Sequence, residues 1–127
     1  VNGMEQSGMD TSHNPLGSAD RLGEVLTALA SVIDSRADAD PETSYTARLL
    51  FAGPVTCAKK LGEETVETAL AAVAQSDVEL AGEASDLIYH LLVTLRSRGV
   101  SLDVVAERLA SGQAVSGLVE KAARPKA

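Results

Sequence analysis

The chain has 127 residues, enough for one domain of ordinary size, and its formal net charge is −7. An acidic balance argues against binding to nucleic acids or to anionic membrane surfaces. Hydrophobic residues make up 45% of the chain but aromatic residues only 2%, so Leu, Val, Ile and Ala must form the core. The single cysteine, Cys57, allows no internal disulfide, and we interpret it as a small packing residue in a reducing compartment. Without a long apolar stretch or a visible signal peptide, the sequence predicts a cytoplasmic protein with no membrane partner.

The first predicted element is a flexible tail over residues 1–17, which contain Gly, Ser, Asn and Pro without an apolar period. Apolar residues then recur at helical spacing as far as Ser35, which predicts a first helix. Ser18 or Asp20 is expected to cap it, because both residue types accept hydrogen bonds from free backbone N–H groups.

A short helix is expected next. Asp40 and Pro41 resemble a helix cap followed by a first-turn proline. The breaker pair Gly53–Pro54 should end this helix, and the sequence predicts a long helix over 55–75.

A second long helix is predicted over 78–98. Ser76 and Glu79 have the spacing of a capping box at its start, and Gly99 supplies a left-handed residue at its end. The connection between the two long helices is only about two residues long, so we expect them to lie antiparallel.

The last helix should begin after Ser101 and end near Gly112, and residues 113–127 are expected to form a tail or a frayed helix. The predicted organisation is therefore a helical domain over 18–112 between two tails. We expect an all-α antiparallel bundle of about four to five helices. A chain this short leaves much apolar surface exposed, which favours completion of the bundle by a second copy.

Two acidic pairs occupy the two long helices. Glu64 and Glu67 are three residues apart and share one helix face, as do Glu83 and Asp86. If the chain folds about residues 76–77, Glu67 and Asp86 each lie about 14 Å from the turn, at 1.5 Å per residue. Glu64 is then about one turn farther from the turn and Glu83 about one turn nearer. The spacing alone therefore predicts that four carboxylates gather in one patch.

Mg²⁺ would relieve the repulsion in this patch, because it prefers oxygen ligands and commonly bridges carboxylates to the phosphates of a substrate. The alternative is an ordinary solvated face. Lys59 and Glu63 are four residues apart, as are Lys60 and Glu64, and this is the spacing of surface ion pairs. The residues by themselves leave both interpretations open.

Four stretches of the sequence, taken together, resemble the phosphoribosyl-ATP pyrophosphohydrolase family of the all-α nucleotide pyrophosphohydrolase superfamily. These stretches are 45–50, 53–54, 58–67 and 83–92. The superfamily pattern, Glu-Glu-x-x-Glu followed by Glu-x-x-Asp, is matched at every acidic position. Enzymes that destroy nucleoside triphosphates share this pattern. The run Lys-Lys-Leu-Gly before it and the run Asp-Leu-Ile-Tyr-His after it point to the histidine-pathway family, and the resemblance covers residues 22–109.

The resemblance implies an Mg²⁺-dependent enzyme that hydrolyses phosphoribosyl-ATP to phosphoribosyl-AMP and pyrophosphate. It implies that Glu64, Glu67, Glu83 and Asp86 are metal ligands and catalytic residues. Glu63 matches the first acid of the motif, and we hypothesise that it positions or deprotonates water or serves as an extra ligand. The resemblance also implies a homodimer in which the helical hairpins pack together.

Five further residues are candidates for binding the substrate. Lys59 and Lys60 precede the acidic motif, and Lys60 either contacts the phosphate chain or pairs with Glu64. Arg48 and Tyr45 either hold ribose or phosphate or pack the short helix against the bundle. His90 is a partner of the site residues, a substrate contact or a structural histidine.

Two other functions remain as alternatives. One is a house-cleaning pyrophosphohydrolase that acts on deoxynucleoside or modified triphosphates. The other is a helical interaction module without catalytic activity, whose acidic face recruits a basic partner.

Overall fold

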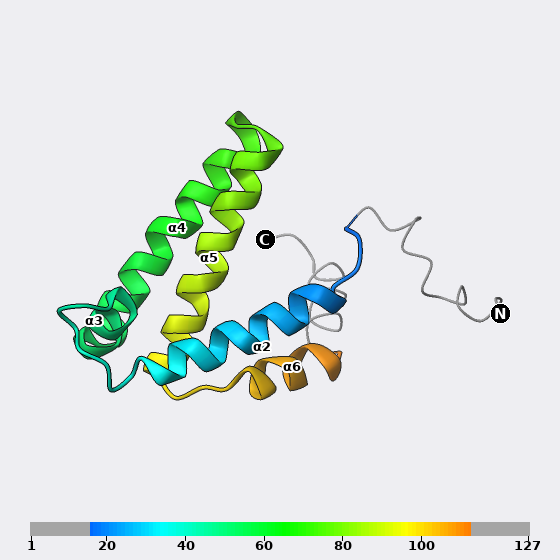
Figure 1. Cartoon of the computed structure of the whole chain (residues 1–127). Helices are drawn as coiled ribbons and strands as arrows, with labels where there is room; N and C mark the ends of the chain where they lie inside the picture. The colour runs from blue at the N-terminus through cyan, green and yellow to red at the C-terminus, as the bar shows by residue number, and fades with distance from the viewer. Residues whose placement is uncertain (1–15, 113–127) are drawn as a thin grey trace, which may run out of the picture.

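The computed structural model describes residues 16–112, so the predicted tail at 113–127 and residues 1–15 of the predicted tail at 1–17 lie outside the described part (Figure 1). Within 16–112 the chain forms helices and no strand, which confirms the all-α prediction. None of these helices combines the length and the hydropathy needed to cross a bilayer. The helices are α2 (Asp20–Ser35), α3 (Tyr45–Ala52), α4 (Pro54–Ala74), α5 (Asp77–Ser97) and α6 (Leu102–Ala110).

The two long helices α4 and α5 form an antiparallel hairpin, as their short connection predicted (Figure 1). The capping box at the start of α5 is confirmed. The Ser76 hydroxyl accepts a hydrogen bond from the Glu79 N–H at 3.1 Å, and Glu79 Oε1 accepts one from the Ser76 N–H at 3.0 Å. At the other end of α5, Gly99 has a φ of +70°, the left-handed conformation expected of it.

The start of α2 differs in detail from the prediction. The residue at the N-cap position is Ala19, and its side chain makes no capping hydrogen bond. The Ser18 hydroxyl accepts instead from the backbone N–H of Asp20 at 3.1 Å. Neither predicted residue therefore occupies the cap, although Ser18 does satisfy one free N–H group at the helix start.

The prediction that Asp40 and Pro41 start the short helix is wrong. Asp40 Oδ1 accepts a hydrogen bond from the Glu42 N–H at 2.9 Å, which closes a side-chain turn instead of a helix. The helix α3 begins at Tyr45, four residues after Pro41. Ser44 is its N-cap, and the Ser44 hydroxyl accepts from the Ala47 N–H at 3.1 Å.

Gly53 joins α3 directly to α4 and serves as the C-cap of one and the N-cap of the other. Its φ of +98° and ψ of 179° lie in a region that only glycine adopts without strain. Pro54 then occupies the first turn of α4, where its missing N–H is not needed. The breaker pair thus ends one helix, as predicted, and also starts the next.

The core lies at one end of the hairpin, which we call the base (residues 54–63 and 87–97). There α2 and α3 pack against α5, and α3 also packs against α4. Cys57 is a packing residue of this core, as expected, and its thiol donates to the Leu49 carbonyl at 3.3 Å. The buried core cluster consists of Ile33, Leu49, Cys57, Leu92 and Val93.

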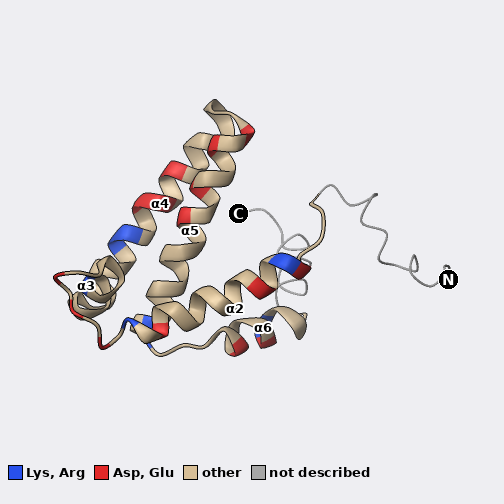
Figure 2. Ribbon diagram, in the orientation of Figure 1, with Lys and Arg blue, Asp and Glu red and all other residues tan. Residues whose placement is uncertain are grey.

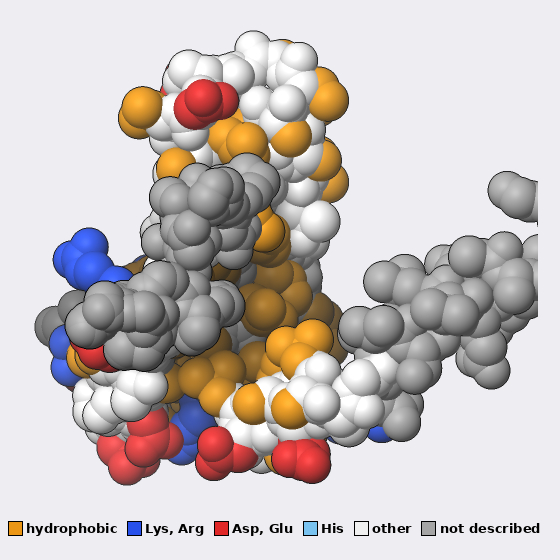
Figure 3. All heavy atoms as spheres, turned by 90° about the vertical axis from the view of Figure 1, so that its right-hand side faces the viewer, with side chains coloured by type: hydrophobic (Ala, Val, Ile, Leu, Met, Phe, Trp, Pro, Cys, Tyr) orange, Lys and Arg blue, Asp and Glu red, His pale blue; other side chains and the backbone are white. Residues whose placement is uncertain are grey.

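The rest of the hairpin, residues 64–86, projects beyond α2, α3 and α6, and we call it the tip (Figure 1). Its single fully buried side chain is that of Ala71. The apolar side chains of Val66, Leu70 and Val73 are exposed, at 58%, 55% and 82%. Figure 3 shows hydrophobic side chains on the surface of this projecting part. The tip therefore contributes little to the core.

Candidate active site

The turn between the long helices is Gln75–Ser76, one residue earlier than the turn we expected, because α4 ends at Ala74. The register of the helices shifts with it. Thr68 on α4 lies opposite Glu83 on α5, and the distance from Thr68 Oγ1 to the Glu83 carbonyl is 3.1 Å. Glu67 and Asp86 therefore do not lie at equal distances from the turn, contrary to our expectation, and each faces other residues across the hairpin.

Three of the four predicted metal ligands meet where the base joins the tip. One carboxylate oxygen each from Glu64, Glu83 and Asp86 lies within 4.8 Å of the others. Glu67 is exposed on α4 and lies close enough to Glu83 to act on its charge. Acidic residues of both helices therefore gather along the hairpin, with the lysines of α4 beside them (Figure 2). The patch predicted from spacing is present, with Glu67 at its edge.

Two oxygens of this acidic cluster (Glu64, Glu67, Glu83 and Asp86) are buried without a partner. Glu64 Oε1 and Glu83 Oε1 have no hydrogen bond to any described residue. A buried carboxylate oxygen without a donor loses its hydration and gains nothing in return. A bound cation would satisfy both oxygens at once.

The electrostatics of the cluster favour a cation for the same reason. Burial raises the pKa of the Glu83 carboxyl, and the negative charges of Glu67, Glu64 and Asp86 raise it further. Both causes disfavour the ionised form in the absence of a compensating positive charge. The donor set consists only of carboxylate oxygens, which suit hard divalent cations such as Mg²⁺, Mn²⁺ or Ca²⁺.

Two threonines that the sequence analysis did not single out tie the helices together beside the site. The Thr68 hydroxyl is shared between the Glu64 carbonyl at 2.8 Å and the Glu83 carbonyl of α5. The Thr94 hydroxyl is shared between the carbonyls of His90 at 2.8 Å and Cys57 at 3.3 Å. Each threonine follows a candidate site residue by four positions, and this spacing was the only signal available.

Glu63 is not part of the acidic cluster. Its Oε1 lies 3.2 Å from the ammonium of Lys60, and both side chains are substantially exposed. The expected ion pair of Lys60 with Glu64 is therefore replaced by a pair with Glu63, three residues away. Glu63 raises the pKa of Lys60 most strongly, followed by Tyr45 and, more weakly, Glu64. Lys59 is exposed on α4.

The other three candidates lie together where α3 meets α5. The Tyr45 hydroxyl is 3.3 Å from His90 Nε2, and His90 Nδ1 is 3.0 Å from the backbone carbonyl of Asp86. The Arg48 guanidinium lies 6.0 Å from the centroid of the Tyr45 ring. Arg48 Nε also donates to the Pro41 carbonyl at 3.3 Å. His90 is buried, so it contacts site residues and not the solvent.

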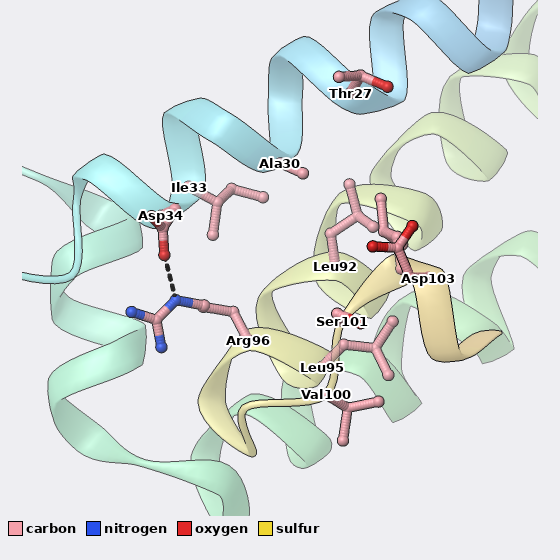
Figure 4. Close-up of a pocket in the computed structure, with 11 residues that line it drawn as sticks. Thr27, Ala30, Ile33, Asp34, Leu92, Leu95, Arg96, Val100, Ser101 and Asp103 are labelled. Atoms are coloured by element: carbon pink, nitrogen blue, oxygen red, sulfur yellow. Dashed lines mark hydrogen bonds and ion pairs between the residues drawn. The ribbon is translucent and has the colours of Figure 1, made fainter. Parts of the chain in front are cut away.

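A cavity of about 350 Å³ lies elsewhere, between α2, the C-terminal part of α5 and the start of α6 (Figure 4). Apolar side chains such as Ile33, Leu92 and Leu95 form much of its lining. At its edge Arg96 Nε donates to Asp34 Oδ1 at 2.7 Å. None of the predicted site residues lines this cavity.

The fold and the site define a class: an all-α protein in which an antiparallel helix pair presents carboxylates suited to a divalent cation. The family model of phosphoribosyl-ATP pyrophosphohydrolase matches residues 26–112. The chain belongs to this family, as its motifs predicted.

Similar proteins bear the same kind of name. The chain is 55% identical to the phosphoribosyl-ATP pyrophosphatase of Caulobacter sp. strain K31, over 83% of this chain and 97% of the relative. Identity to the phosphoribosyl-ATP pyrophosphatase of Methylobacterium radiotolerans is 54%, over 78% of this chain and 92% of that protein. Identity to the phosphoribosyl-ATP pyrophosphatase of Ruegeria pomeroyi is 48%, over 80% of this chain and 97% of that protein.

Proposed function

We propose that this protein hydrolyses phosphoribosyl-ATP to phosphoribosyl-AMP and pyrophosphate, as a step of histidine biosynthesis in the cytoplasm. Membership of the family and the names of relatives near 50% identity support the reaction. The observation that carries the proposal is the meeting of Glu64, Glu83 and Asp86, two of which have buried oxygens without partners. Such a cluster is costly in a protein that has no cation to bind there.

Mg²⁺ is the proposed cofactor. Glu64, Glu83 and Asp86 would hold it, and Glu67 adjoins them as the fourth carboxylate of the motif. When bound, the ion would neutralise negative charge on the phosphate oxygens and stabilise the charge that develops as the phosphoanhydride bond is cleaved.

The residues around the cluster would bind and orient the rest of the substrate. Lys60, Lys59 and Arg48 are cations on the two elements beside the cluster, and we propose that they contact phosphate oxygens. Glu63 is exposed next to Lys60, and we propose that it orients the attacking water from there.

A direct assay tests the activity. Pyrophosphate release should be fast with phosphoribosyl-ATP and slow with ATP and dATP at equal concentrations. We expect Glu64→Gln to lower kcat by about 100-fold or more, the usual cost of losing a group that stabilises charge in the transition state. Glu107→Gln, which removes an exposed carboxylate from α6, is the matched control and should leave the rate unchanged.

Other results would redirect the assignment. Faster turnover of dATP than of phosphoribosyl-ATP would favour the house-cleaning alternative. Full activity in Glu64→Gln would exclude the proposed metal site. Absence of hydrolysis in the wild-type protein with every substrate would leave the interaction module.

Metal binding is measured separately from turnover. Mg²⁺ binds only the folded cluster, so it should raise the melting temperature of the wild-type protein. The same concentration should have a much smaller effect on Glu64→Gln, because one of its three ligands is lost. Equal shifts in the two proteins would contradict the assignment of Glu64 as a ligand.

We further propose that two copies of the chain associate through the tip. Val66, Leu70 and Val73 follow each other at helical spacing on α4 and are exposed in one copy. Leu70→Glu should convert a dimer into a monomer in light scattering coupled to size exclusion. Val104→Glu, at an exposed valine of α6, should leave the dimer intact, and a monomeric wild-type protein would contradict the proposal.

A further inference from the structure

The start of α3 is attached to α5 by two adjacent pairs of side chains. The hydroxyl of Tyr45 pairs with His90, and the hydroxyl of Thr46 pairs with that of Tyr89. The two tyrosine rings lie nearly parallel, with centroids 6.5 Å apart. The pairs differ in exposure, because Tyr45 is 43% exposed whereas Tyr89 is partly buried. Only the first pair is well placed to meet a ligand.

The hydrogen bonds of His90 determine the direction of the bond to Tyr45. A backbone carbonyl can only accept, so His90 Nδ1 must carry the proton that it donates to Asp86 at 3.0 Å. In the neutral imidazole Nε2 is then an acceptor, and the Tyr45 hydroxyl donates its proton to it. The exposed Tyr45 therefore has only oxygen lone pairs left for a ligand.

The neighbours of Tyr45 are donors. The Arg48 guanidinium lies 6.0 Å from its ring, and the Lys60 ammonium is near enough for the two groups to interact electrostatically. Phosphate oxygens are acceptors, so Arg48 and Lys60 suit them and the lone pairs of Tyr45 do not. A substrate group that binds Tyr45 must bring its own hydrogen.

We propose that the Tyr45 hydroxyl oxygen accepts a hydrogen bond from a sugar hydroxyl of the substrate, and that His90 is a positioning residue that holds it ready to do so. The inference rests on the proposed function, in which the substrate carries ribose next to its phosphates. It makes Tyr45 a residue that recognises the sugar, whereas Arg48 and Lys60 recognise the phosphate chain. His90, which is 8% exposed, acts through Tyr45 and Asp86.

The first test compares two Tyr→Phe variants. Tyr45→Phe should raise KM for phosphoribosyl-ATP about fivefold, as expected for the loss of one neutral hydrogen bond, with kcat nearly unchanged. Tyr89→Phe breaks the neighbouring pair of the same attachment and should leave both constants unchanged. An equal rise of KM in the two variants would show that the attachment of α3 matters and not the exposed hydroxyl, and would overturn the proposal.

The second test uses two amides at His90. In His90→Gln the side chain can place an oxygen near the position of Nε2 and so still accept from Tyr45, and KM should remain near the wild-type value. In His90→Asn the amide reaches only the position of Nδ1, so KM should rise as in Tyr45→Phe. Combined with Tyr45→Phe, His90→Asn should raise KM no further, because both changes remove the same interaction. Additive effects, or equal losses in the two amide variants, would overturn the role of His90.

Inhibition by the products identifies the group that Tyr45 binds. Phosphoribosyl-AMP carries sugar hydroxyls and pyrophosphate carries none, so Tyr45→Phe should raise the inhibition constant of the first and not of the second. The opposite result would mean that Tyr45 donates to phosphate, which overturns the inference while leaving the proposed function intact. Failure of the proposed function would be seen instead as a wild-type protein that does not hydrolyse phosphoribosyl-ATP.

Discussion

The base and the tip of the α4–α5 hairpin are built on different principles. At the base, α2 and α3 cover the long helices, and side chains such as Ile33 and Val93 are almost completely buried. Among the described elements, the tip helices pack mainly against each other, and Val73 and Val78 are 82% exposed. Both parts nevertheless belong to the same two helices, α4 and α5.

The difference explains where the acidic cluster can exist. Four carboxylates in the core would each need a charged partner, at a desolvation cost that often exceeds the gain. At the start of the tip the carboxylates are close to the core, so Glu64 and Glu83 are partly buried, yet they remain accessible to an ion. The base thus supplies rigidity, and the tip tolerates a repulsion that the core does not.

The largest expected effect is on the core of the base. Ile33→Ala should lower the free energy of unfolding by about 2–5 kcal/mol, the usual range for truncating a large aliphatic side chain in a core. Val78→Ala truncates an exposed side chain at the tip and should cost no more than about 0.5 kcal/mol. Urea denaturation of both variants measures the contrast, and similar losses would show that Val78 is buried in solution, for example within the proposed interface between copies.

Removing a charge at the start of the tip should instead stabilise the protein when no divalent cation is present. Glu83→Gln relieves repulsion by Glu67, Glu64 and Asp86, so without divalent cations it should melt at a higher temperature than the wild-type protein. The same variant should lose hydrolysis. With Mg²⁺ present the order of the melting temperatures should reverse, because the wild-type protein gains a ligand that the variant binds poorly. If Glu83→Gln melted at a lower temperature than the wild-type protein in the presence of a chelator, repulsion within the acidic cluster would be contradicted.

A smaller effect is expected at the far end of the tip. Ser76→Ala removes the hydroxyl that caps α5 and should cost about 1 kcal/mol, typical of N-cap substitutions. Ser31→Ala, on the exposed face of α2, is a control that leaves every cap in place. Chemical denaturation of the two variants gives the comparison, and equal stabilities would mean that the tip frays in the wild-type protein.

The smallest effect concerns pH. Hydrogen bonds from the Ser76 N–H and hydroxyl lower the pKa of Glu79 below its ordinary value of 4.5. Because the folded state favours the carboxylate, its contribution is fully present above pH 4.5 and is lost as the pH falls through the lowered pKa. The melting temperature of the wild-type protein should therefore exceed that of Glu79→Gln at pH 7, and the difference should shrink below pH 4. A gap independent of pH would contradict this assignment.

Much of the fold could be predicted because its signals are local. The capping box of Ser76 and Glu79 and the left-handed Gly99 fix the ends of α5 to within a residue. Asp40 and Pro41 were misleading, since an aspartate before a proline suits a helix cap and a side-chain turn equally well. The helix α3 begins after Ser44 because the Ser44 side chain caps it.

The sequence predicted which residues form the candidate site but not how α4 and α5 are aligned against each other. One residue in the position of the turn decides whether Glu67 lies opposite Asp86 or beside Glu83, and no local pattern fixes the turn so closely. Glu63 illustrates the same limit. It precedes Glu64 in the chain, but adjacent residues of a helix point about 100° apart, so it faces Lys60 instead of the cluster.

The junction at Gly53 links the two halves of the proposed substrate site. The carboxylates belong to the hairpin, whereas Tyr45 and Arg48 belong to α3, which is connected to α4 through this one residue. A β-carbon at Gly53 would meet no atom within 4 Å, so a substitution there would act through backbone torsion alone. The backbone conformation of Gly53 thus contributes, together with the packing of α3 on α5, to where Tyr45 and Arg48 lie relative to the carboxylates.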